Sequence, residues 1–198
     1  MPSCLVDAPE VELRADLLAE TRVFSNRLDL LQGLAFPTNG IVSEVGTSTG
    51  VWAKQMIRLL KPLRLYVVDI DFSRFDRSIE KEVELKMLEG DSIQMISGLP
   101  DNHLDFAYID ANHSYLSVKG EIDAIYPKMK AESFLMFNDY VRFSVNQVLP
   151  YGVQSAVNEF ANATSSTIVG VALSGTGNYD IALKVSKRKT RMSDRQAE

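Results

Sequence analysis

Cysteine is almost absent from this chain of 198 residues, in which Cys4 is the only one. A single cysteine cannot form an internal disulfide or a cysteine-based zinc cluster, so we expect a reducing compartment. The sequence also lacks an apolar run near the ~18 residues that a membrane helix needs, and its first residues lack the basic and apolar regions of a secretory signal. We therefore expect a cytoplasmic protein with no membrane partner.

Internal repeats, low-complexity tracts and Gly/Ser linkers are missing as well. Hydrophobic residues make up 45% of the chain and charged residues 24%, which is ordinary for a globular protein. Length and composition together predict a single folded core with no internal domain boundary.

A basic surface is missing from most of the chain. The net charge is −5 at pH 7, yet residues 184–198 hold six basic and two acidic side chains, which leaves 15 basic and 24 acidic side chains elsewhere. Because an acidic body repels phosphate backbones, we expect a small-molecule partner and no nucleic acid. We expect the basic end, residues 187–198, to be a flexible tail.

What is present is an alternation of short apolar runs with helical patterns. Apolar residues at helical spacing predict a helix over 10–32 that stops at Gly33; they are Leu13, Leu17, Phe24, Leu28 and Leu31. Five strands are predicted at 41–45, 65–68, 83–87, 104–109 and 134–137, with helices at 51–60, 92–98, 115–129 and 153–161 between and after them. Two last strands, 167–173 and 179–185, form a hairpin across 174–178. The pattern predicts an α/β fold, a doubly wound (Rossmann-like), mostly parallel seven-stranded sheet with a C-terminal antiparallel hairpin.

A glycine-bounded turn, Gly46-Thr47-Ser48-Thr49-Gly50, follows the first of these strands. It allows close backbone approach, and the next helix offers free N–H groups. The phosphate-loop Lys-Ser/Thr is replaced by Val51-Trp52, which disfavours a nucleoside triphosphatase. The dinucleotide fingerprint G-x-G-x-x-G fails at Ser48 and Val51, which weakens an oxidoreductase reading. An ordinary strand-to-helix turn remains open.

Acidic and small residues also follow the second and third strands. Asp69 stands where a carboxylate can accept hydrogen bonds from both ribose hydroxyls, although Asp71 competes for this role and either acid can cap a helix. Asp91 and Ser92 follow the third strand and can bond an adenine edge, cap a helix, or do both.

The turn, the acid and the Gly-Asp-Ser come in the order that resembles class I S-adenosylmethionine-dependent methyltransferases. The likeness continues through Ile109-Asp110-Ala111-Asn112-His113-Ser114-Tyr115 and Phe137-Asn138-Asp139-Tyr140 and covers about residues 40–185. Within this superfamily the chain is most similar to the small catechol and caffeoyl-CoA O-methyltransferases and their bacterial relatives. The resemblance implies an S-adenosylmethionine-binding methyltransferase domain over 40–186 and an N-terminal helical lid or extension over 1–39, which in relatives also mediates homodimer contacts.

The resemblance further implies which residues surround S-adenosylmethionine. Those near the methionine part and the ribose follow the first two strands, and those near the adenine follow the third; in all they are Glu44, Gly46, Thr47, Ser48, Gly50, Asp69, Asp91, Ser92 and Asp110. A sulfonium cofactor favours carboxylates and close backbone over a phosphate cradle, which agrees with the acidic body.

Relatives of this kind also bind a divalent cation, and the matching residues here are Asp110, Asn138 and Asp139. Three hard oxygen donors suit Mg²⁺, or Mn²⁺ or Ca²⁺, better than zinc. The catechol enzyme has its Asp-Asn pair in the opposite order, so an alternative is that the two acids only line the pocket mouth or cap helices.

His113 follows Asp110 by three residues, where catechol-type enzymes carry a basic catalytic residue, and a neutral imidazole can take a hydroxyl proton. The alternative is a loop histidine that bonds a helix end. Another branch uses an Asp at the position of Asn112, and an amide cannot do that work. Tyr115 and Tyr140 either border the substrate or pack in the core.

The sequence thus predicts divalent-metal-assisted O-methylation of a small-molecule hydroxyl. Two alternatives stay open: a metal-independent N- or O-methyltransferase of the same fold, and a cofactor-binding protein without transfer activity. The identity of the substrate lies in loops that the sequence does not decode.

Overall fold

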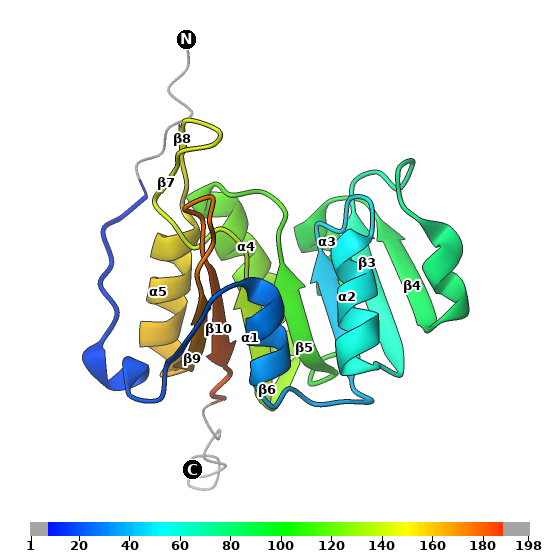
Figure 1. The fold of residues 1–198 in the computed structure, drawn as a ribbon, viewed down its shortest axis with the longest axis horizontal. Helices are drawn as coiled ribbons and strands as arrows, with labels where there is room; N and C mark the ends of the chain where they lie inside the picture. The colour runs from blue at the N-terminus through cyan, green and yellow to red at the C-terminus, as the bar shows by residue number, and fades with distance from the viewer. Residues whose placement is uncertain (1–7, 188–198) are drawn as a thin grey trace, which may run out of the picture.

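The computed structural model describes residues 8–187 and consists of one central sheet between two helical layers (Figure 1). The helices are α1 Arg27–Gly33, α2 Val51–Leu60, α3 Ser92–Ser97, α4 Tyr115–Ile125 and α5 Val153–Thr164, with 3-10 turns η1 Ala15–Leu18, η2 Arg77–Lys81 and η3 Tyr126–Lys128. The strands of the central sheet are β1 Arg22–Phe24, β2 Ile41–Val45, β3 Arg64–Asp69, β4 Glu84–Glu89, β5 Leu104–Ile109, β6 Met129–Phe137, β9 Thr167–Ala172 and β10 Asp180–Lys184. A separate two-stranded ribbon pairs β7 Phe143–Ser144 with β8 Leu149–Pro150.

The strand order β1-β9-β10-β6-β5-β2-β3-β4 confirms the predicted doubly wound α/β sheet. From β2 the chain winds outward through β3 to β4, returns to the other side of β2 at β5, and continues to β6, all in parallel. β10 runs antiparallel to both of its neighbours, β6 and β9, as the hairpin predicts. The winding reverses between β2 and β5, and the carboxyl ends of the strands at such a switch point are where ligands bind in these sheets.

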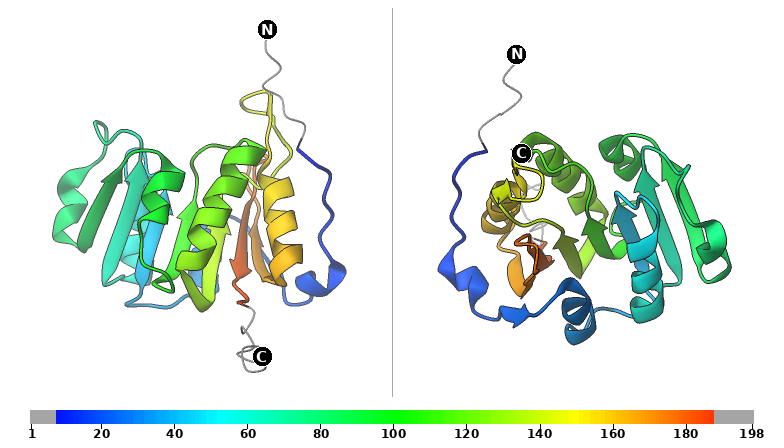
Figure 2. Two further views of the ribbon diagram at one scale, coloured as in Figure 1. Left: turned by 180° about the vertical axis from the view of Figure 1, so that it is seen from behind. Right: turned by 45° about the horizontal axis from the view of Figure 1, so that its top comes forward.

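Alternating side chains of the central strands fill two separate cores. In β5, Phe106 and Tyr108 point to the face covered by α1 and α2, whereas Ala107 and Ile109 point to the face covered by α3, α4 and α5. The helices of the first face lie in front of the sheet in Figure 1, and α4 and α5 lie in front when the molecule is turned round in Figure 2. Burial on both faces explains why β2, β3 and β5 are nearly continuous apolar runs.

The N-terminal segment differs most from the sequence prediction. The single helix expected over 10–32 is wrong: the chain has the short turn η1, then β1 paired in parallel with β9, then α1. Two asparagines of α5 bind the backbone just before η1, which is not helical. Asn158 Nδ2 donates to Val11 O at 2.7 Å, and Asn162 Nδ2 donates to Glu12 O at 2.8 Å. The apolar residues that mimic one helical stripe pack into different cores, Leu17 beside α5 and Leu31 beside α2.

Smaller differences concern lengths and the number of strands. β6 begins at Met129, five residues before the prediction, and the helix expected over 115–129 ends at Ile125 in favour of η3, which contains Pro127. The sheet has eight strands because β1 adds to its edge. The predicted basic tail lies outside the described residues except for Lys187, and the lid or dimer role of residues 1–39 stays a prediction.

None of the helices in residues 8–187 combines the length and the apolar character that crossing a bilayer requires.

Candidate functional site

The glycine turn brings the backbone of β2 against the end of β5. Gly46 has φ +84°, and a Cβ added there would lie 2.0 Å from the carbonyl oxygen of Asp110. Two backbone hydrogen bonds of 2.8 Å hold the turn against both neighbouring strands: Gly46 N–H donates to Val68 O of β3, and Asp110 N–H donates to Val45 O of β2. A side chain at position 46 is therefore incompatible with the way in which the strands meet.

Asp69, at the end of β3, ties the same turn to the second strand. One carboxylate oxygen accepts from the Ser48 backbone N–H at 2.7 Å, and the other accepts from the Asp71 N–H at 3.2 Å. Asp71 uses its own carboxylate on Ser73, accepting from both the backbone and the hydroxyl of that residue. Of the two competing acids, Asp69 lines the cavity described below and Asp71 does not.

Asp91 and Ser92 begin α3 and reach the same space. Asp91 caps the helix by accepting from Gln94 N–H at 3.0 Å, while Ser92 donates to Glu121 of α4 at 2.6 Å. Burial raises the pKa of Glu121 to about 7 despite this hydrogen bond. The capping and pocket-lining roles, left open by the sequence, are thus compatible in one residue.

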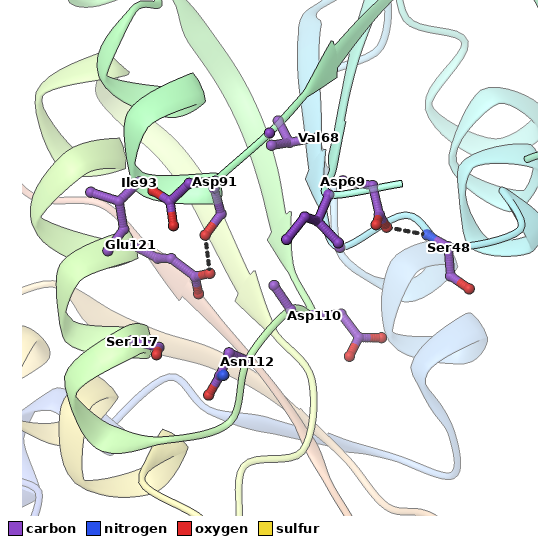
Figure 3. Close-up of a pocket in the computed structure, with 14 residues that line it drawn as sticks. Ser48, Val68, Asp69, Asp91, Ile93, Asp110, Asn112, Ser117 and Glu121 are labelled. Atoms are coloured by element: carbon purple, nitrogen blue, oxygen red, sulfur yellow. Dashed lines mark hydrogen bonds between the residues drawn. The ribbon is translucent and has the colours of Figure 1, made fainter. Parts of the chain in front are cut away.

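These residues converge on a cavity of about 470 Å³ at the carboxyl ends of β2, β3, β4 and β5 (Figure 3). Figure 3 shows Asp69, Asp91 and Asp110 reaching the cavity from three different strand ends. Its lining is Gly46, Ser48, Val68, Asp69, Ile70, Gly90, Asp91, Ser92, Ile93, Asp110, Ala111, Asn112, Ser117 and Glu121. The carboxylates can accept hydrogen bonds from sugar hydroxyl groups, and the apolar side chains beside them can pack against a flat base. The lining therefore fits a nucleoside.

Three of the predicted cofactor residues lie outside this lining. Glu44 is 1% exposed beneath the turn, where the Thr47 hydroxyl donates to its carboxylate. Burial raises the pKa of Glu44 to about 8 even though Thr47 counteracts the shift. Gly50 has φ +79° and abuts Phe75, so it shapes the start of α2. The structure therefore places Glu44, Thr47 and Gly50 under or behind the cavity wall.

A second cavity of about 370 Å³ lies on the other side of Asp110. It is lined by Ser25, Asn26, Arg27, Asp110, Asn138, Asp139, Leu173, Ser174, Gly175, Thr176, Asn178 and Asp180. These residues come from the β1–α1 junction, the end of β6 and the β9–β10 loop. Asp110 is the one residue that lines both cavities.

His113 lies behind the two acids of this boundary. Its Nε2 is 3.3 Å from Asp139 Oδ2 and 3.6 Å from Asp110 Oδ1, and its ring stacks on Tyr151 with centroids 4.4 Å apart. Burial alone lowers the pKa of His113, but the neighbouring carboxylates raise it, and the net pKa lies above the ordinary value. His113 lines neither cavity, whereas Asp110 and Asp139, the two acids nearest its Nε2, both line the second cavity.

The predicted metal ligands are close together but face other partners. Asn138 Nδ2 donates to Asp110 Oδ1 at 2.9 Å, and its Oδ1 lies 3.5 Å from Arg27 Nη1. Arg27 Nη1 is also 4.0 Å from Asp110 Oδ2. A divalent ion among these oxygens would lie beside a permanent cation, so the arrangement does not fit one as it stands. Over the described residues, no group of three or more His, Cys, Asp or Glu side chains is positioned to hold a metal ion.

Sequence reasoning missed several lining residues. Ile70 is 79% exposed directly after Asp69, and Glu121 reaches the first cavity from a helix 29 residues after Ser92. Arg27 and Asp180 are brought to the second cavity from opposite ends of the chain. An exposed isoleucine next to a predicted ribose-binding acid is a detectable signal, whereas nothing in the sequence pairs residue 27 with residue 180.

The expected tyrosines have structural contacts. Tyr140 donates to Asn158 Oδ1 at 2.6 Å and Tyr115 donates to Glu159, so both connect their segments to α5. The packing alternative considered for them accounts for these contacts.

A family model described as a methyltransferase domain matches residues 43–140, which spans β2 to the end of β6. A sequence search of curated proteins finds no significant match. Solved structures match in fold. The N-methyltransferase NodS from Bradyrhizobium japonicum aligns with a TM-score of 0.62 at 13% identity, covering 81% of this chain and 93% of that one.

Two other structures match similarly. A SAM-dependent methyltransferase from Aquifex aeolicus gives a TM-score of 0.59 at 14% identity, covering 79% of this chain and 88% of its own. MycE, a methyltransferase of the mycinamycin biosynthetic pathway solved with Mg and SAH, gives 0.60 at 12% identity and covers 85% of this chain and 51% of its own. At these identities the likeness establishes the fold and leaves the acceptor open.

Proposed function

We propose that this chain, a class I S-adenosylmethionine-dependent methyltransferase by the family of residues 43–140 and by its fold, methylates a hydroxyl group of a small molecule. The observation that carries the proposal is that two cavities meet at one carboxylate, Asp110. A donor in the first cavity and an acceptor in the second would face each other at this boundary.

The first cavity supports cofactor binding. Asp69 would accept hydrogen bonds from the ribose, and Asp91 and Ser92 would border the base, with Ile70 and Ile93 supplying apolar contact. The carboxylate of Asp110 would lie near the positive charge of the cofactor. When bound, S-adenosylmethionine supplies an electrophilic methyl group, so that the acceptor O–C bond forms as the S–C bond breaks with its electron pair going to sulfur.

The protein must then take up the hydroxyl proton of the acceptor. Asp139 lines the second cavity, and His113 Nε2 stands 3.3 Å behind its carboxylate. We assign the proton to His113, the proposed general base, reached along Asp139. Since methyl transfer asks for little other covalent chemistry, the remaining task of the cavity walls is to position the acceptor and exclude water.

The metal-assisted form of this reaction requires Arg27 to move away from Asp110 and Asn138. The same contacts favour the second candidate, a metal-independent methyltransferase of the same fold. Mg²⁺ at Asp110, Asn138 and Asp139 stays a prediction that metal titration tests.

The two histidines of the chain offer a matched test of the proposed base. We expect His113→Gln to lower the rate of methyl transfer by about 100-fold or more, because general bases contribute at least this much. S-adenosylhomocysteine affinity, measured by calorimetry, should stay unchanged. His103→Gln is the control, since His103 lies at the amino end of β5, opposite the carboxyl ends that form the cavities, and contacts Tyr66.

The pH profile of transfer gives a second readout. Because a base must be unprotonated and the pKa of His113 is raised, wild-type activity should rise with pH over a range above that of an ordinary histidine. The variant should lose this rise. A rate of methyl transfer in His113→Gln equal to that of the wild type would contradict the assignment of His113 as the base. Failure of the wild-type protein to bind S-adenosylhomocysteine would contradict the methyltransferase function.

A further inference from the structure

The second cavity combines one fixed cation with a wall of hydroxyl and amide groups. We propose that it binds an uncharged, hydroxyl-rich acceptor and that the Arg27 guanidinium holds the reacting oxygen, in the place where the family resemblance puts a divalent cation. This inference rests on the proposed function and adds the acceptor class and the residue that positions it.

Arg27 is fixed from behind and open in front. Its Nη1 donates to the Tyr108 hydroxyl at 2.9 Å, and its guanidinium carbon lies 5.0 Å from the centre of the Trp52 ring. Tyr108 in turn donates to Asp180 at 2.9 Å. The side chain of Arg27 is nevertheless 44% exposed, and no hydrogen bond to the described residues involves its Nε or Nη2. A planar donor held in this way has N–H groups left for an oxygen in the cavity.

Arg27 places its positive charge where the family resemblance implies a divalent cation. The guanidinium faces Asp110 and the amide oxygen of Asn138, two of the three expected metal ligands. A hydroxyl bound to it would sit beside Asp110, the residue shared with the cofactor cavity. The negative charge that develops on the oxygen as its proton leaves would be stabilised by the guanidinium.

The cavity wall indicates a polar acceptor. Hydroxyl and amide side chains surround the opening, namely Ser25, Asn26, Ser174, Thr176 and Asn178, and Leu173 is the single large apolar side chain in the lining. Asn178 Oδ1 is buried without a hydrogen-bond partner among the described residues. A ligand hydroxyl that reached this oxygen would satisfy it, and an apolar ligand would not.

The charge of the wall argues against an anionic acceptor. Two acids, Asp110 and Asp139, line the cavity against the single cation, and the buried carboxyl group of Asp180, whose pKa is raised to about 7, adds a third acidic side chain. A carboxylate or phosphate on the acceptor would meet like charges on two sides. A flat aromatic acceptor lacks the apolar wall that it would need. A neutral glycoside or polyol satisfies both conditions.

The test compares acceptor classes and arginine variants under metal-free conditions. The probes are uncharged methyl glycosides and inositol, set against catechol and a hydroxybenzoate, each with methyl-labelled S-adenosylmethionine in EDTA and then in Mg²⁺. We expect transfer to a glycoside or to inositol to exceed transfer to catechol by about tenfold or more. EDTA should change the rate by less than about twofold.

Arg27→Gln should lower kcat/KM for the acceptor about 100-fold, and Arg27→Lys should restore part of it, since a charged hydrogen bond is worth about 10- to 150-fold. Arg58→Gln is the matched control, an exposed arginine on α2 that contacts Gln55. Melting temperature and S-adenosylhomocysteine affinity should be the same in all four proteins, which separates positioning of the acceptor from structural damage.

Several results would overturn the inference while leaving the methyltransferase function intact. One is a kcat/KM of Arg27→Gln equal to that of the wild type, and another is a preference for catechol with activation by Mg²⁺. A third is intact cofactor binding with no transfer to either the methyl glycosides or inositol. Absence of S-adenosylhomocysteine binding to the wild type would instead contradict the proposed function, and this inference with it.

Discussion

The two cavities that share Asp110 are built in different ways. The first cavity is built from consecutive strand–turn–helix units, and most of its residues follow directly after β2, β3, β4 and β5. The second cavity gathers residues 25–27, 138–139, 173–176, 178 and 180 around Asp110, from segments that lie far apart in the sequence. Local turn chemistry defines the first cavity, and long-range packing defines the second.

The largest effect should follow from a side chain in the glycine turn. Gly46→Val places a Cβ 2.0 Å from the Asp110 carbonyl oxygen at φ +84°, so the turn after β2 cannot keep its close approach to the end of β5. We expect S-adenosylhomocysteine affinity to fall by at least about 100-fold and the melting temperature to drop, measured by calorimetry. Gly98→Ala is the control, because a Cβ there meets nothing closer than 3.5 Å. Near wild-type binding by Gly46→Val would show that the turn does not form the donor site.

A smaller loss should separate the two acids after β3. Asp69→Asn removes the charge that faces the first cavity and weakens the bond to Ser48 N–H, so affinity for S-adenosylhomocysteine should fall about 10- to 100-fold. Asp71→Asn changes a carboxylate that contacts Ser73 outside the cavity and should leave the affinity within about twofold. Equal losses in both variants would contradict the assignment of Asp69.

The last comparison concerns stability against pH and distinguishes the two regions. The pKa of Glu44, beneath the cofactor turn, rises from 4.5 to about 8, so the folded state holds a proton that the unfolded state releases. The stability that this proton contributes is complete below pH 4.5 and is lost as the pH rises towards 8, with a slope of at most about 1.4 kcal/mol per pH unit. The pKa of Asp180, which lines the second cavity, is also raised, from 3.8 to about 7, so the stability that its proton contributes is lost as the pH rises over that range.

Urea unfolding at several pH values between 4 and 9 measures this difference. Glu44→Gln should flatten the pH dependence up to about pH 8, and Asp180→Asn only up to about pH 7. The same slope in wild type and Glu44→Gln would mean that this carboxyl group is ionised in the folded protein.

The contrast between the cavities also explains what the sequence could predict. The strands β3 and β5 were predictable because burial on both faces leaves an apolar run, and Asp69 was predictable because it ends such a run. Asp91 follows the half-exposed β4 and was identified from the Gly-Asp-Ser segment instead. A single helix was wrongly predicted for the N-terminal segment because its apolar residues share a helical spacing yet pack on two opposite faces of the sheet. Period alone cannot distinguish one helix from a turn, an edge strand and a short helix in succession.

The residues of the second cavity were predictable only in part. The segment from Asp110 to His113 and the pair Asn138-Asp139 were identified by motif, and the structure brings Asp110, His113 and Asp139 together. The contact of Arg27 with Asn138 joins residues 111 positions apart, and no local pattern encodes it. A motif therefore suggested a metal where the tertiary structure supplies an arginine.

The pairing of β1 with β9 has a consequence for synthesis on the ribosome. Residues 22–24 are made well before their partners, residues 170–172. Strands β2 to β5 can pair while the chain is still growing, whereas β1 must wait for β9 before it can dock. Arg27 follows β1 directly, so a nascent chain, or one cut before β9, can form the first cavity before Arg27 is held in the second.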